Sequence, residues 1–371
     1  MKIVEVNPFF HPYDGGIERR MYDISKLLAA KGHEVTVVTG RLSADDPEEE
    51  VLDGFRIIRL KSRLIKIYNP PFISSKDVRE TLESINPDVV DYHYRWAPSY
   101  NKDLADYIGP KVFTYHNMWG EGEGLVGSLS ERNDNRFAKD CLCTFDHIIA
   151  VSDYVRDDLL RRGYSPQYVT SIPPGLSEEP VPGDGSGDYI LSLGRLVRTK
   201  GLDVLIEAMK DVDHKLVICG KGPDFKRLQK AVASAGLGDR VEMRGFVSDE
   251  EKSRLMGECR FFVMPSLHES FGLAAVELMS HGRPLVCSDA DGLPSTVGDA
   301  GYVVPKGDAA ALAEAMNRMF EDRELCESKA SKALETARSY DWDILLPKVE
   351  EVYSKVASGE YTLEDNGREA L

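Results

Sequence analysis

The sequence predicts an α/β protein with two doubly wound domains, and three of its features lead to this prediction. Short apolar runs of strand length alternate with stretches of helical periodicity over the first 175 residues, and a second such series starts near residue 189. Between the two series, residues 180–188 are rich in proline, glycine and aspartate, which is typical of a linker. Because alternating strands and helices form parallel sheets with helices on both faces, we expect two doubly wound domains with a cleft between them.

The predicted domain boundaries follow from the two series. The N-terminal domain covers residues 1–175 and the second domain covers residues 186–339, with residues 176–185 as the linker. A further helix is expected at about residues 340–357. Residues 358–371 are rich in glycine and acidic side chains, so we expect them to form a flexible tail.

In the first domain, runs rich in valine and isoleucine predict strands that are buried on both faces of a parallel sheet. Ser152 is the expected N-cap of the helix that follows the last of them. The acidic residues 45–50 are expected to form a solvated loop, and the four glycines of residues 119–129 predict a mobile loop. The expected strands are residues 2–6, 34–39, 88–92, 111–115 and 146–151, and the expected helices include residues 17–30 and 76–84.

The second domain repeats the alternation of strands and helices. The carboxyl ends of parallel strands lie at one edge of a sheet, so the loops that follow these strands are candidate functional segments. The expected strands are residues 189–193, 216–219, 241–243, 261–264 and 285–287, and later helices are expected at residues 309–320, 326–337 and 344–356.

Composition and charge exclude some classes of protein. The chain has 371 residues, of which 42% are hydrophobic, and its formal net charge of −16 argues against nonspecific binding to nucleic acid. No apolar run has the length of a membrane span, and the N-terminus enters a strand without the apolar core of a signal peptide. The six cysteines show no zinc or redox spacing. These features predict a cytoplasmic protein.

The sequence HESFGLAAVE, between an apolar strand and a helical run, places two carboxylates eight positions apart. Glu269 is expected in the loop and Glu277 about one turn into the helix. The amides of Phe271, Gly272 and Leu273 then lie between the two acids, at a helix N-terminus that favours anions. Ionised acids accept hydrogen bonds from hydroxyl groups, so this order suits a sugar, a diphosphate and a ribose.

Two glycine-containing loops are further candidates for phosphate binding. Arg195 and Lys200 lie in a glycine-bounded loop ahead of a helix, where a bidentate guanidinium and a compact ammonium suit a diphosphate. Gly15 and Gly16 follow the first strand and permit close approach of the backbone to an anion. They do not form the GxGxxG fingerprint of dinucleotide-binding domains.

Together these motifs resemble the retaining GT-B glycosyltransferases of family 4, with Glu269 and Glu277 matching their E-x7-E motif. The resemblance extends over most of the chain, from Gly15 and Gly16 to the segment around Trp342. It implies a GT-B fold of two facing Rossmann-like domains, an N-terminal acceptor domain and a C-terminal nucleotide-sugar donor domain. It also implies that the last helix returns to complete the N-terminal domain.

The resemblance assigns the phosphates of the donor to the two basic and glycine-rich loops. Arg195 and Lys200 match the diphosphate clamp of the family, and Gly15 and Gly16 match the loop that faces the donor phosphates. Side chains and backbone amides would then supply the positive charge that the departing diphosphate needs. No acidic pair is placed to hold a metal at the phosphates, so neither a metal nor another cofactor is expected.

The remaining candidate residues contact the sugar and the nucleoside. The resemblance implies that Glu269 and His116 are catalytic, with Glu269 holding the transferred sugar and His116 between donor sugar and acceptor. Glu277 would bind the ribose, and Gly220 and Val247 would lie near the nucleoside. Many relatives have aspartate after this histidine, whereas this chain has asparagine, so a role that needs a second acid there is open.

The implied activity is hexosyl transfer from a nucleoside diphosphate sugar, such as a UDP or GDP sugar, to an acceptor hydroxyl with retention of configuration. Two alternatives are open. A GT-B epimerase would bind the same donor and use cleft acids to move a ring proton. A noncatalytic module would bind the nucleotide sugar without reacting it, although the intact acidic and basic motifs argue against such a loss of activity.

Residues 56–66 contain five basic and several aliphatic residues in an otherwise acidic chain. One interpretation is an exposed strand whose basic side chains pair with the acidic residues 45–50. The other is a patch that binds anionic lipid at the inner face of the cell membrane and gives access to a lipid-linked acceptor. The basic residues are Arg56, Arg59, Lys61, Arg63 and Lys66.

Overall fold

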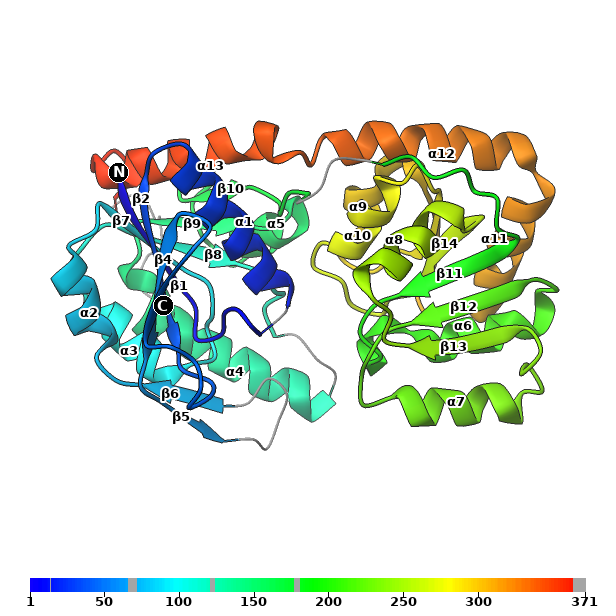
Figure 1. The fold of residues 1–371 in the computed structure, drawn as a ribbon, viewed down its shortest axis with the longest axis horizontal. Coiled ribbons are helices and arrows are strands. Elements are labelled where there is room, and N and C mark those ends of the chain that lie inside the picture. Colours follow the sequence, from blue (N-terminus) through cyan, green and yellow to red (C-terminus); the bar gives the residue numbers. More distant parts are fainter. Residues whose placement is uncertain (14, 66–71, 121–123, 177–180, 363–371) are drawn as a thin grey trace. The chain divides into compact units, whose positions relative to one another are not determined.

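The chain divides into two compact units, one formed by Met1–Pro174 with Asp343–Leu371 and the other by Gly175–Trp342 (Figure 1). Each unit contains a parallel or largely parallel sheet, which confirms the predicted α/β class with two doubly wound domains. Within the described part of the chain, no helix combines the length and the apolar character needed to cross a bilayer. The computed structural model describes residues 1–13, 15–65, 72–120, 124–176 and 181–362.

The sheet of the first unit has the strand order β10-β9-β8-β7-β1-β2-β4-β3. All neighbouring strands are parallel except β3 and β4. The chain builds outward from β1 on one side and then crosses to β7 on the other, so the switch point of the sheet lies between β1 and β7. The strands are β1 (Lys2–Val6), β2 (Glu34–Gly40), β3 (Glu49–Leu52), β4 (Phe55–Leu60), β7 (Val89–Tyr92), β8 (Lys111–Tyr115), β9 (His147–Ala150) and β10 (Val169–Ser171).

Helices cover this sheet, and its central strands are fully buried, as their valine-rich and isoleucine-rich sequences predict. Ser152 caps the N-terminus of α5, because its Oγ accepts a hydrogen bond from the amide of Val155. A separate antiparallel hairpin is formed by β5 (Ser62–Ile65) and β6 (Phe72–Ser75). The helices are α1 (Gly16–Ala30), α2 (Val78–Ile85), α3 (Pro98–Asp106), α4 (Gly124–Asp140), α5 (Asp153–Arg161) and α13 (Trp342–Ala357).

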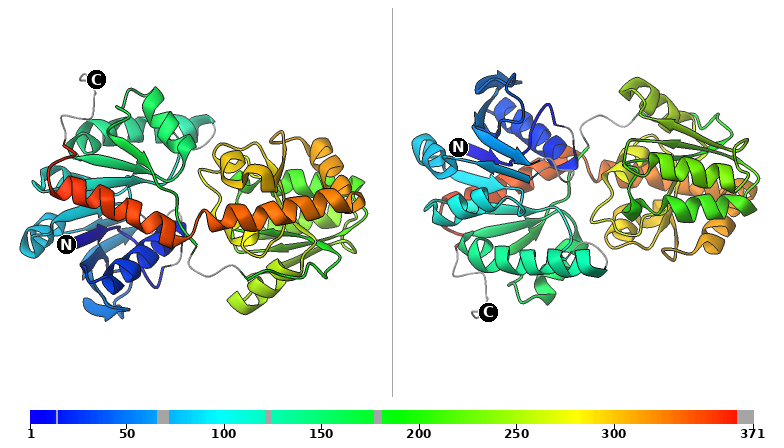
Figure 2. Two further views of the ribbon diagram at one scale, coloured as in Figure 1. Left: turned by 90° about the horizontal axis from the view of Figure 1, so that it is seen from above. Right: turned by 90° about the horizontal axis from the view of Figure 1, so that it is seen from below.

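The C-terminal helix α13 packs on the first unit, as the red helix in Figures 1 and 2 shows. Its Tyr353 is fully buried and bonds to Glu5 of β1 and Asp91 of β7. Beyond the helix, the ring of Tyr361 stacks on that of His147, with 4.2 Å between centroids. Residues 358–362 of the predicted tail are therefore held against this unit, and the rest of the tail lies outside the described residues.

The second unit has a parallel sheet with the strand order β13-β12-β11-β14-β15-β16. Its switch point lies between β11 and β14. The strands are β11 (Tyr189–Leu193), β12 (Lys215–Cys219), β13 (Val241–Gly245), β14 (Phe261–Met264), β15 (Leu285–Ser288) and β16 (Gly301–Val304). The helices are α6 (Leu202–Ala208), α7 (Phe225–Ser234), α8 (Asp249–Glu258), α9 (Leu273–Met279), α10 (Leu293–Val297), α11 (Ala309–Glu321) and α12 (Arg323–Arg338).

The expected mobile loop at residues 119–129 is wrong in its second half, because helix α4 begins at Gly124. The cause is a buried carboxylate in that helix. Asp134 accepts hydrogen bonds from Arg95 Nε at 2.6 Å and from the amide of Gly120 at 2.8 Å. These long-range contacts stabilise a helix that the glycines alone disfavour. Residues 121–123 lie outside the described part of the chain.

The acidic stretch at residues 45–50 is not wholly a solvated loop, because Glu49 and Glu50 begin strand β3. This strand pairs with β4 and brings each acid to a basic residue. Arg56 Nη2 lies 2.6 Å from Glu49 Oε2, and the buried Arg59 forms an ion pair with Glu50. Two of the five basic residues of segment 56–66 are thus neutralised within the unit, as the first interpretation of that segment requires.

The other basic residues of this segment have a different setting. Lys61 and Arg63 are exposed and form no ion pair with any described residue, whereas Lys66 lies outside the described residues.

The predicted linker, residues 176–185, is not a free connection over its whole length. The amide of Gly183 bonds to His281 O at 2.9 Å and that of Gly185 bonds to Gly257 O at 3.0 Å. The second half of the linker is therefore attached to the second unit, and residues 177–180 lie outside the described residues.

Candidate functional site

The best-defined group of predicted site residues lies in the second unit, after strands β11 and β14. Lys200 Nζ forms an ion pair with Glu269 Oε2, and the hydroxyl of Ser266 lies 3.4 Å from the same carboxylate oxygen. The side chains of Lys200 and Glu269 are only 20% and 13% exposed. The two strands are neighbours at the switch point, so their carboxyl ends bring together residues that are 69 positions apart.

Backbone contacts fix the basic loop against the acidic loop. The amide of Leu267 donates to Thr199 O at 2.8 Å. Next to Lys200, Gly201 has a φ of 64°, and a Cβ there would collide with the carbonyl oxygen of Pro265. Glycine is therefore required for the two loops to approach so closely. This approach holds the ammonium of Lys200 beside Glu269.

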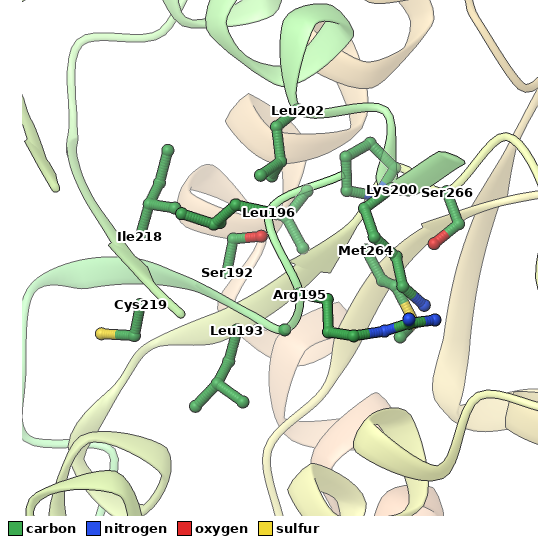
Figure 3. A pocket seen from close by; sticks show the side chains of 13 residues that line it. Ser192, Leu193, Arg195, Leu196, Lys200, Leu202, Ile218, Cys219, Met264 and Ser266 are labelled. Atoms are coloured by element: carbon green, nitrogen blue, oxygen red, sulfur yellow. The ribbon is translucent and has the colours of Figure 1, made fainter. Parts of the chain in front are cut away.

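Arg195 and Lys200 line the same small pocket, together with Ser266 and Met264 (Figure 3). The backbone of the arginine loop is tied to the next loop, because the amide of Leu196 donates to Lys221 O at 2.8 Å. The pocket thus combines two cations, a hydroxyl and the nearby carboxylate of Glu269. Such a set can bind an anionic group beside a group that carries hydroxyls.

The second acid of the motif lies in helix α9, which begins at Leu273 with Gly272 as its N-cap. Glu277 Oε2 lies 2.6 Å from Lys252 Nζ of α8, and the two side chains are 19% and 25% exposed. The amides of Phe271, Gly272 and Leu273 bond to no acceptor within the described residues. In this respect they match the free amides that the sequence predicts between the two acids.

The two predicted nucleoside residues lie in neighbouring loops of the same unit. The amide of Gly220, directly after β12, donates to Gly245 O at 2.7 Å. Val247 follows β13 and packs its half-buried side chain against the apolar core of the unit. Both residues therefore lie at the same edge of the sheet as the basic loop after β11, because all these strands are parallel.

Sequence reasoning missed Asp291, which organises the loop of Glu269. Its Oδ2 accepts a hydrogen bond from the amide of Glu269 at 3.1 Å and lies 3.3 Å from His268 Nδ1. The amide of Gly292 in turn donates to Glu269 O at 2.9 Å. Asp291 has a φ of 48°, which places it in the left-handed region. An Asp-Gly pair just after strand β15 is the signal that could have identified it.

In the first unit, Gly15 and Gly16 form the start of helix α1 after β1. Gly15 is the N-cap, and Gly16 is the first helical residue. A Cβ on Gly16 would meet no atom within 4 Å, so internal packing does not explain the glycine. The side-chain amide of Asn7, in the same loop, donates through Nδ2 to Glu18 Oε1 at 3.0 Å. An open backbone at a helix N-terminus is suited to a phosphate.

His116 follows strand β8 at the carboxyl edge of the first sheet. Its Nε2 lies 3.0 Å from Nδ1 of His93, which follows β7. Burial, together with the nearby charges of Arg20 and Arg95, lowers the pKa of His116 well below its ordinary value. The ring is therefore neutral at neutral pH. His116 and the two glycines belong to the first unit, and the other predicted residues belong to the second.

The folds of several solved structures match nearly the whole chain. The sucrose-phosphate synthase of Thermosynechococcus elongatus superposes with a TM-score of 0.80 at 21% identity, covering 96% of this chain and 99% of that structure. Anabaena HepE in complex with UDP and glucose superposes with a TM-score of 0.77 at 19% identity, covering 96% and 100%. The architecture is that of the GT-B glycosyltransferases, as predicted.

Family models and sequence relatives also indicate a glycosyltransferase, in agreement with the fold. Residues 14–179 match the model "Glycosyltransferase Family 4", and residues 179–336 match "Glycosyl transferases group 1". The chain belongs to the family 4 glycosyltransferases. It is 28% identical to the phosphatidyl-myo-inositol mannosyltransferase of Mycobacterium leprae, over 96% of this chain and 98% of the relative. It is 27% identical to a phosphatidylinositol N-acetylglucosaminyltransferase subunit of Schizosaccharomyces pombe, over 95% and 80%.

Proposed function

We propose that the protein is a retaining hexosyltransferase that moves a sugar from a nucleoside diphosphate sugar to a hydroxyl group of an acceptor. The observation that carries this proposal is the contact between Lys200 and Glu269 in the loops beside Arg195. A cation that binds phosphate and an acid that binds hydroxyls lie next to each other there. A nucleotide sugar carries its diphosphate and its sugar hydroxyls in the same relation.

The proposed chemistry is stabilisation of the departing diphosphate. As the bond to the sugar breaks, negative charge grows on the phosphate oxygens, and Arg195 and Lys200 bind that charge. The amides of Phe271 to Leu273 and of Gly16 add further donors. Glu269 accepts hydrogen bonds from hydroxyls of the transferred sugar and keeps its reacting carbon in place. No metal or other cofactor takes part in this proposal.

Glu277 is proposed to bind the ribose of the donor. Within the protein its charge is balanced by Lys252 at 2.6 Å, just as Lys200 balances Glu269. These pairs lower the cost of holding two acids in a partly buried site before the donor binds. On binding, ribose hydroxyls donate to the carboxylate of Glu277, and the amide groups next to it bind phosphate.

For the donor, UDP sugars are the first candidates, and GDP sugars are the second. Support comes from the Anabaena HepE structures, which contain UDP, UDP with glucose, or UDP-glucose. For the acceptor, we propose a lipid-linked alcohol at the inner face of the cell membrane. The names of two relatives support this choice, since both describe transfer to phosphatidylinositol lipids.

The test is a screen of UDP, GDP and ADP sugars for release of the nucleoside diphosphate, with and without phosphatidylinositol vesicles. Mass spectrometry of the lipid should find one added hexose, and NMR of the product should find the anomeric configuration of the donor. An inverted product would contradict the retaining mechanism. An epimerised sugar nucleotide, or binding without any turnover, would favour the epimerase or the noncatalytic module instead.

A further inference from the structure

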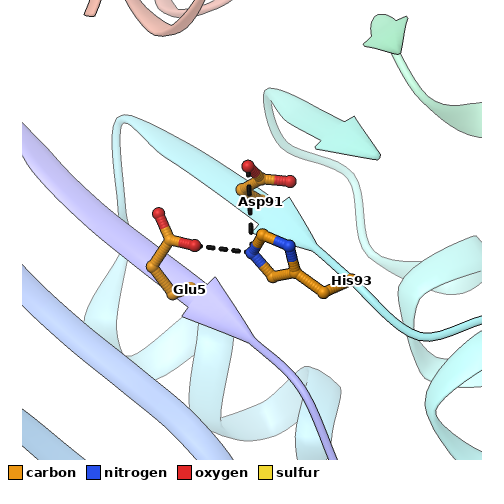
Figure 4. Close-up of side chains that lie close together, drawn as sticks. All are labelled: Glu5, Asp91 and His93. Atoms are coloured by element: carbon orange, nitrogen blue, oxygen red, sulfur yellow. Dashed lines mark hydrogen bonds and ion pairs between the residues drawn. The ribbon is translucent and has the colours of Figure 1, made fainter. Parts of the chain in front are cut away.

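A cluster of buried polar side chains lies beneath His116, in the centre of the first sheet (Figure 4). Glu5 of β1 and Asp91 of β7 face each other in register, and both are 0% exposed. His93 follows β7 and is 2% exposed. Their ligand atoms lie within 4.8 Å of one another, which is close enough for a metal site. Each is already hydrogen-bonded within the protein, as described next, so we interpret the cluster as a hydrogen-bond network.

The network forms a chain from the interior to His116. Glu5 Oε2 lies 2.6 Å from His93 Nε2, and His93 Nδ1 lies 3.0 Å from His116 Nε2. The other ring nitrogen of His116, Nδ1, has no hydrogen-bond partner among the described residues. One end of this hydrogen-bonded series is therefore a buried acid, and the other end is a nitrogen of His116, the residue that the family resemblance places between donor sugar and acceptor.

The direction of each hydrogen bond follows from the first, because a neutral imidazole carries one N–H and one lone pair. If Glu5 is ionised, it accepts from His93 Nε2–H, so His93 Nδ1 must accept from His116 Nε2–H. The free Nδ1 of His116 then carries a lone pair and accepts from a hydroxyl. If Glu5 is protonated and donates to His93, every bond reverses, and Nδ1 of His116 carries a proton.

The groups around the chain determine which member titrates. Burial raises the pKa of Glu5 to about 7, against the lowering effects of Arg20 from α1 and of Tyr353 from α13. Burial lowers the pKa of His93 to about 4, with Asp91 opposing and Arg20 adding to the effect. His116 is also neutral, as described above. Near neutral pH, Glu5 is therefore the member of the chain that gains or loses a proton.

Tyr353 and Arg20 are the two groups that favour the ionised acid. The hydroxyl of Tyr353 lies 2.9 Å from Glu5 Oε1 and 2.6 Å from Asp91 Oδ2. Asp91 also accepts from Thr114 Oγ1 at 2.8 Å. The guanidinium of Arg20 is buried, and its three nitrogens have no hydrogen-bond partner among the described residues, so within this part of the chain it acts on the acids by its charge.

We propose that Glu5 and His93 are positioning residues that set the tautomer of His116 and so decide whether its Nδ1 accepts from or donates to a substrate hydroxyl. The role of His116 in transfer rests on the proposed function. The chain of two hydrogen bonds that joins Glu5, His93 and His116 does not, because it lies wholly within the first unit. With Glu5 ionised, His116 orients the hydroxyl of the acceptor by accepting its proton in a hydrogen bond, and the alcohol oxygen keeps its lone pairs for the donor sugar.

The test is nitrogen NMR of the full chain labelled with ¹⁵N in its histidine rings. The ring of His116 is assigned from the signals that a His116→Asn variant lacks. In the wild-type protein the proton of His116 should move from Nδ1 to Nε2 as the pH rises through about 7. The ring should stay uncharged throughout. His33, which lies 3.0 Å from Glu350, is an internal reference outside this network.

Two variants test whether the hydrogen-bonded series from Glu5 through His93 to His116, here called the relay, causes the change in the tautomer of His116. Glu5→Gln, of nearly equal volume, should abolish the pH-dependent exchange of the proton. Tyr353→Phe removes a donor to the ionised Glu5, so the pH at which the proton of His116 exchanges should rise. This variant tests the proposal if Glu5→Gln does not fold. A His116 tautomer that stays constant from pH 5.5 to 8.5 in the wild-type protein would overturn the proposal. Unchanged exchange in Glu5→Gln would do the same.

Turnover of the nucleotide sugar distinguishes this proposal from the proposed function. If the relay exists but the protein is no transferase, the NMR exchange will occur while no donor is consumed. If the protein is a transferase without the relay, donor will be consumed while the tautomer of His116 stays constant. If both hold, kcat should change with the midpoint seen by NMR in the wild-type protein, and Glu5→Gln should lose that dependence with little change in the donor KM.

Discussion

At the scale of single residues, Lys200 is the side chain whose replacement should have the clearest effect. It is 20% exposed and pairs with Glu269, so Lys200→Ala removes the charge that we propose to bind the diphosphate and leaves Glu269 without this partner. Losing a hydrogen bond to a charged group costs about 1.5–3 kcal/mol. We expect nucleoside diphosphate binding, measured by calorimetry, to weaken roughly ten- to a hundredfold.

Arg198 provides the matched control for this experiment. It lies in the same loop, but its side chain is 72% exposed and lies 3.8–3.9 Å from the carboxylates of Asp203 and Asp224. Arg198→Ala should therefore bind the nucleotide nearly as well as the wild-type protein. Equal affinity of the Lys200 and Arg198 variants would show that the basic loop does not bind the diphosphate.

Replacing the two acids of the motif should change different kinetic constants. Glu277→Ala should raise the KM for the donor roughly ten- to a hundredfold, because the bonds to ribose form before and during the reaction alike. Glu269→Ala should mainly lower kcat, because the transferred sugar is held less well at the reacting centre. Steady-state kinetics measure both effects. Glu314→Ala, on the exposed face of α11, is the control, and wild-type kinetics in both motif variants would refute the assignment.

The buried Glu5 also makes a prediction about stability. Its pKa is raised from 4.5 to about 7, so the folded first unit binds this proton more tightly than the unfolded chain does. The contribution of this proton to the free energy of unfolding is complete below pH 4.5 and is lost as the pH rises through 7. Relative to wild type, Glu5→Gln should therefore gain about 3 kcal/mol of unfolding free energy between these two pH values.

Urea unfolding followed by tryptophan fluorescence measures this difference, since two of the three tryptophans, Trp96 and Trp119, lie in the first unit. Glu34→Gln is the control, because that acid is 69% exposed and lies 4.0 Å from Lys2. Its stability relative to wild type should vary little over the same range. A pH-independent difference for Glu5→Gln would mean that the buried acid keeps its ordinary pKa.

At the scale of elements, the β5–β6 hairpin is the surface that we propose for contact with an anionic membrane. Ile65 and Phe72 are partners across the two strands and are 45% and 57% exposed, and Arg63 lies on the same face two residues earlier. Lys61 precedes the hairpin and is exposed as well. Apolar and basic side chains that share a face favour the surface of an anionic bilayer.

Co-sedimentation with phosphatidylinositol-containing vesicles tests this element. Each basic side chain near the surface contributes about 1 kcal/mol, so Lys61→Gln with Arg63→Gln should weaken binding roughly ten- to thirtyfold at low salt. Arg56→Gln is the control, because Arg56 already pairs with Glu49 at 2.6 Å. Salt should reduce wild-type binding. If the wild-type protein does not sediment at low salt, a soluble acceptor becomes the better hypothesis.

Two elements show how far local sequence predicts structure in this chain. The glycines at residues 119–129 favour a loop, yet α4 begins at Gly124 because Asp134 is held by Arg95 and by the backbone of Gly120. Ser152, by contrast, was identified correctly as an N-cap, because its bond to Val155 spans only three residues. Contacts of short range are encoded in the spacing of residues, whereas contacts of long range are not.

At the scale of the whole molecule, the reaction is expected to proceed without a metal ion. In the proposed reaction, Arg195, Lys200 and the amides at the start of α9, which bond to no acceptor within the described residues, provide positive charge for the departing diphosphate. Turnover of the nucleotide sugar should therefore persist in excess EDTA. Complete loss of activity that magnesium or manganese restores would mean that a cation binds at the phosphates. Binding of the nucleoside diphosphate to the EDTA-treated protein is the control that separates loss of affinity from loss of chemistry.

The fold class and most strands could be predicted from the amino-acid sequence alone, because apolar runs of strand length and helical periodicity are local properties of the chain. It also predicted the two acids, the basic loop and the glycines as candidate site residues, because the spacing of charges and glycines is visible without a structure. Which loops follow buried strands could be predicted in the same way. Their identification as a site still depends on the experiments above.

Which of these residues meet depends on the order of the strands in the folded sheets. Lys200 and Glu269 are 69 positions apart, and they pair because β11 and β14 are neighbours in the sheet. Glu5 reaches His93 across 88 positions, and Tyr353 reaches Glu5 across 348. Arg59 looked like a surface cation in the sequence, but strand β3 buries it against Glu50. Side-chain charge is fixed by the sequence, whereas its burial and its partner depend on strand order, which the whole chain determines when it folds.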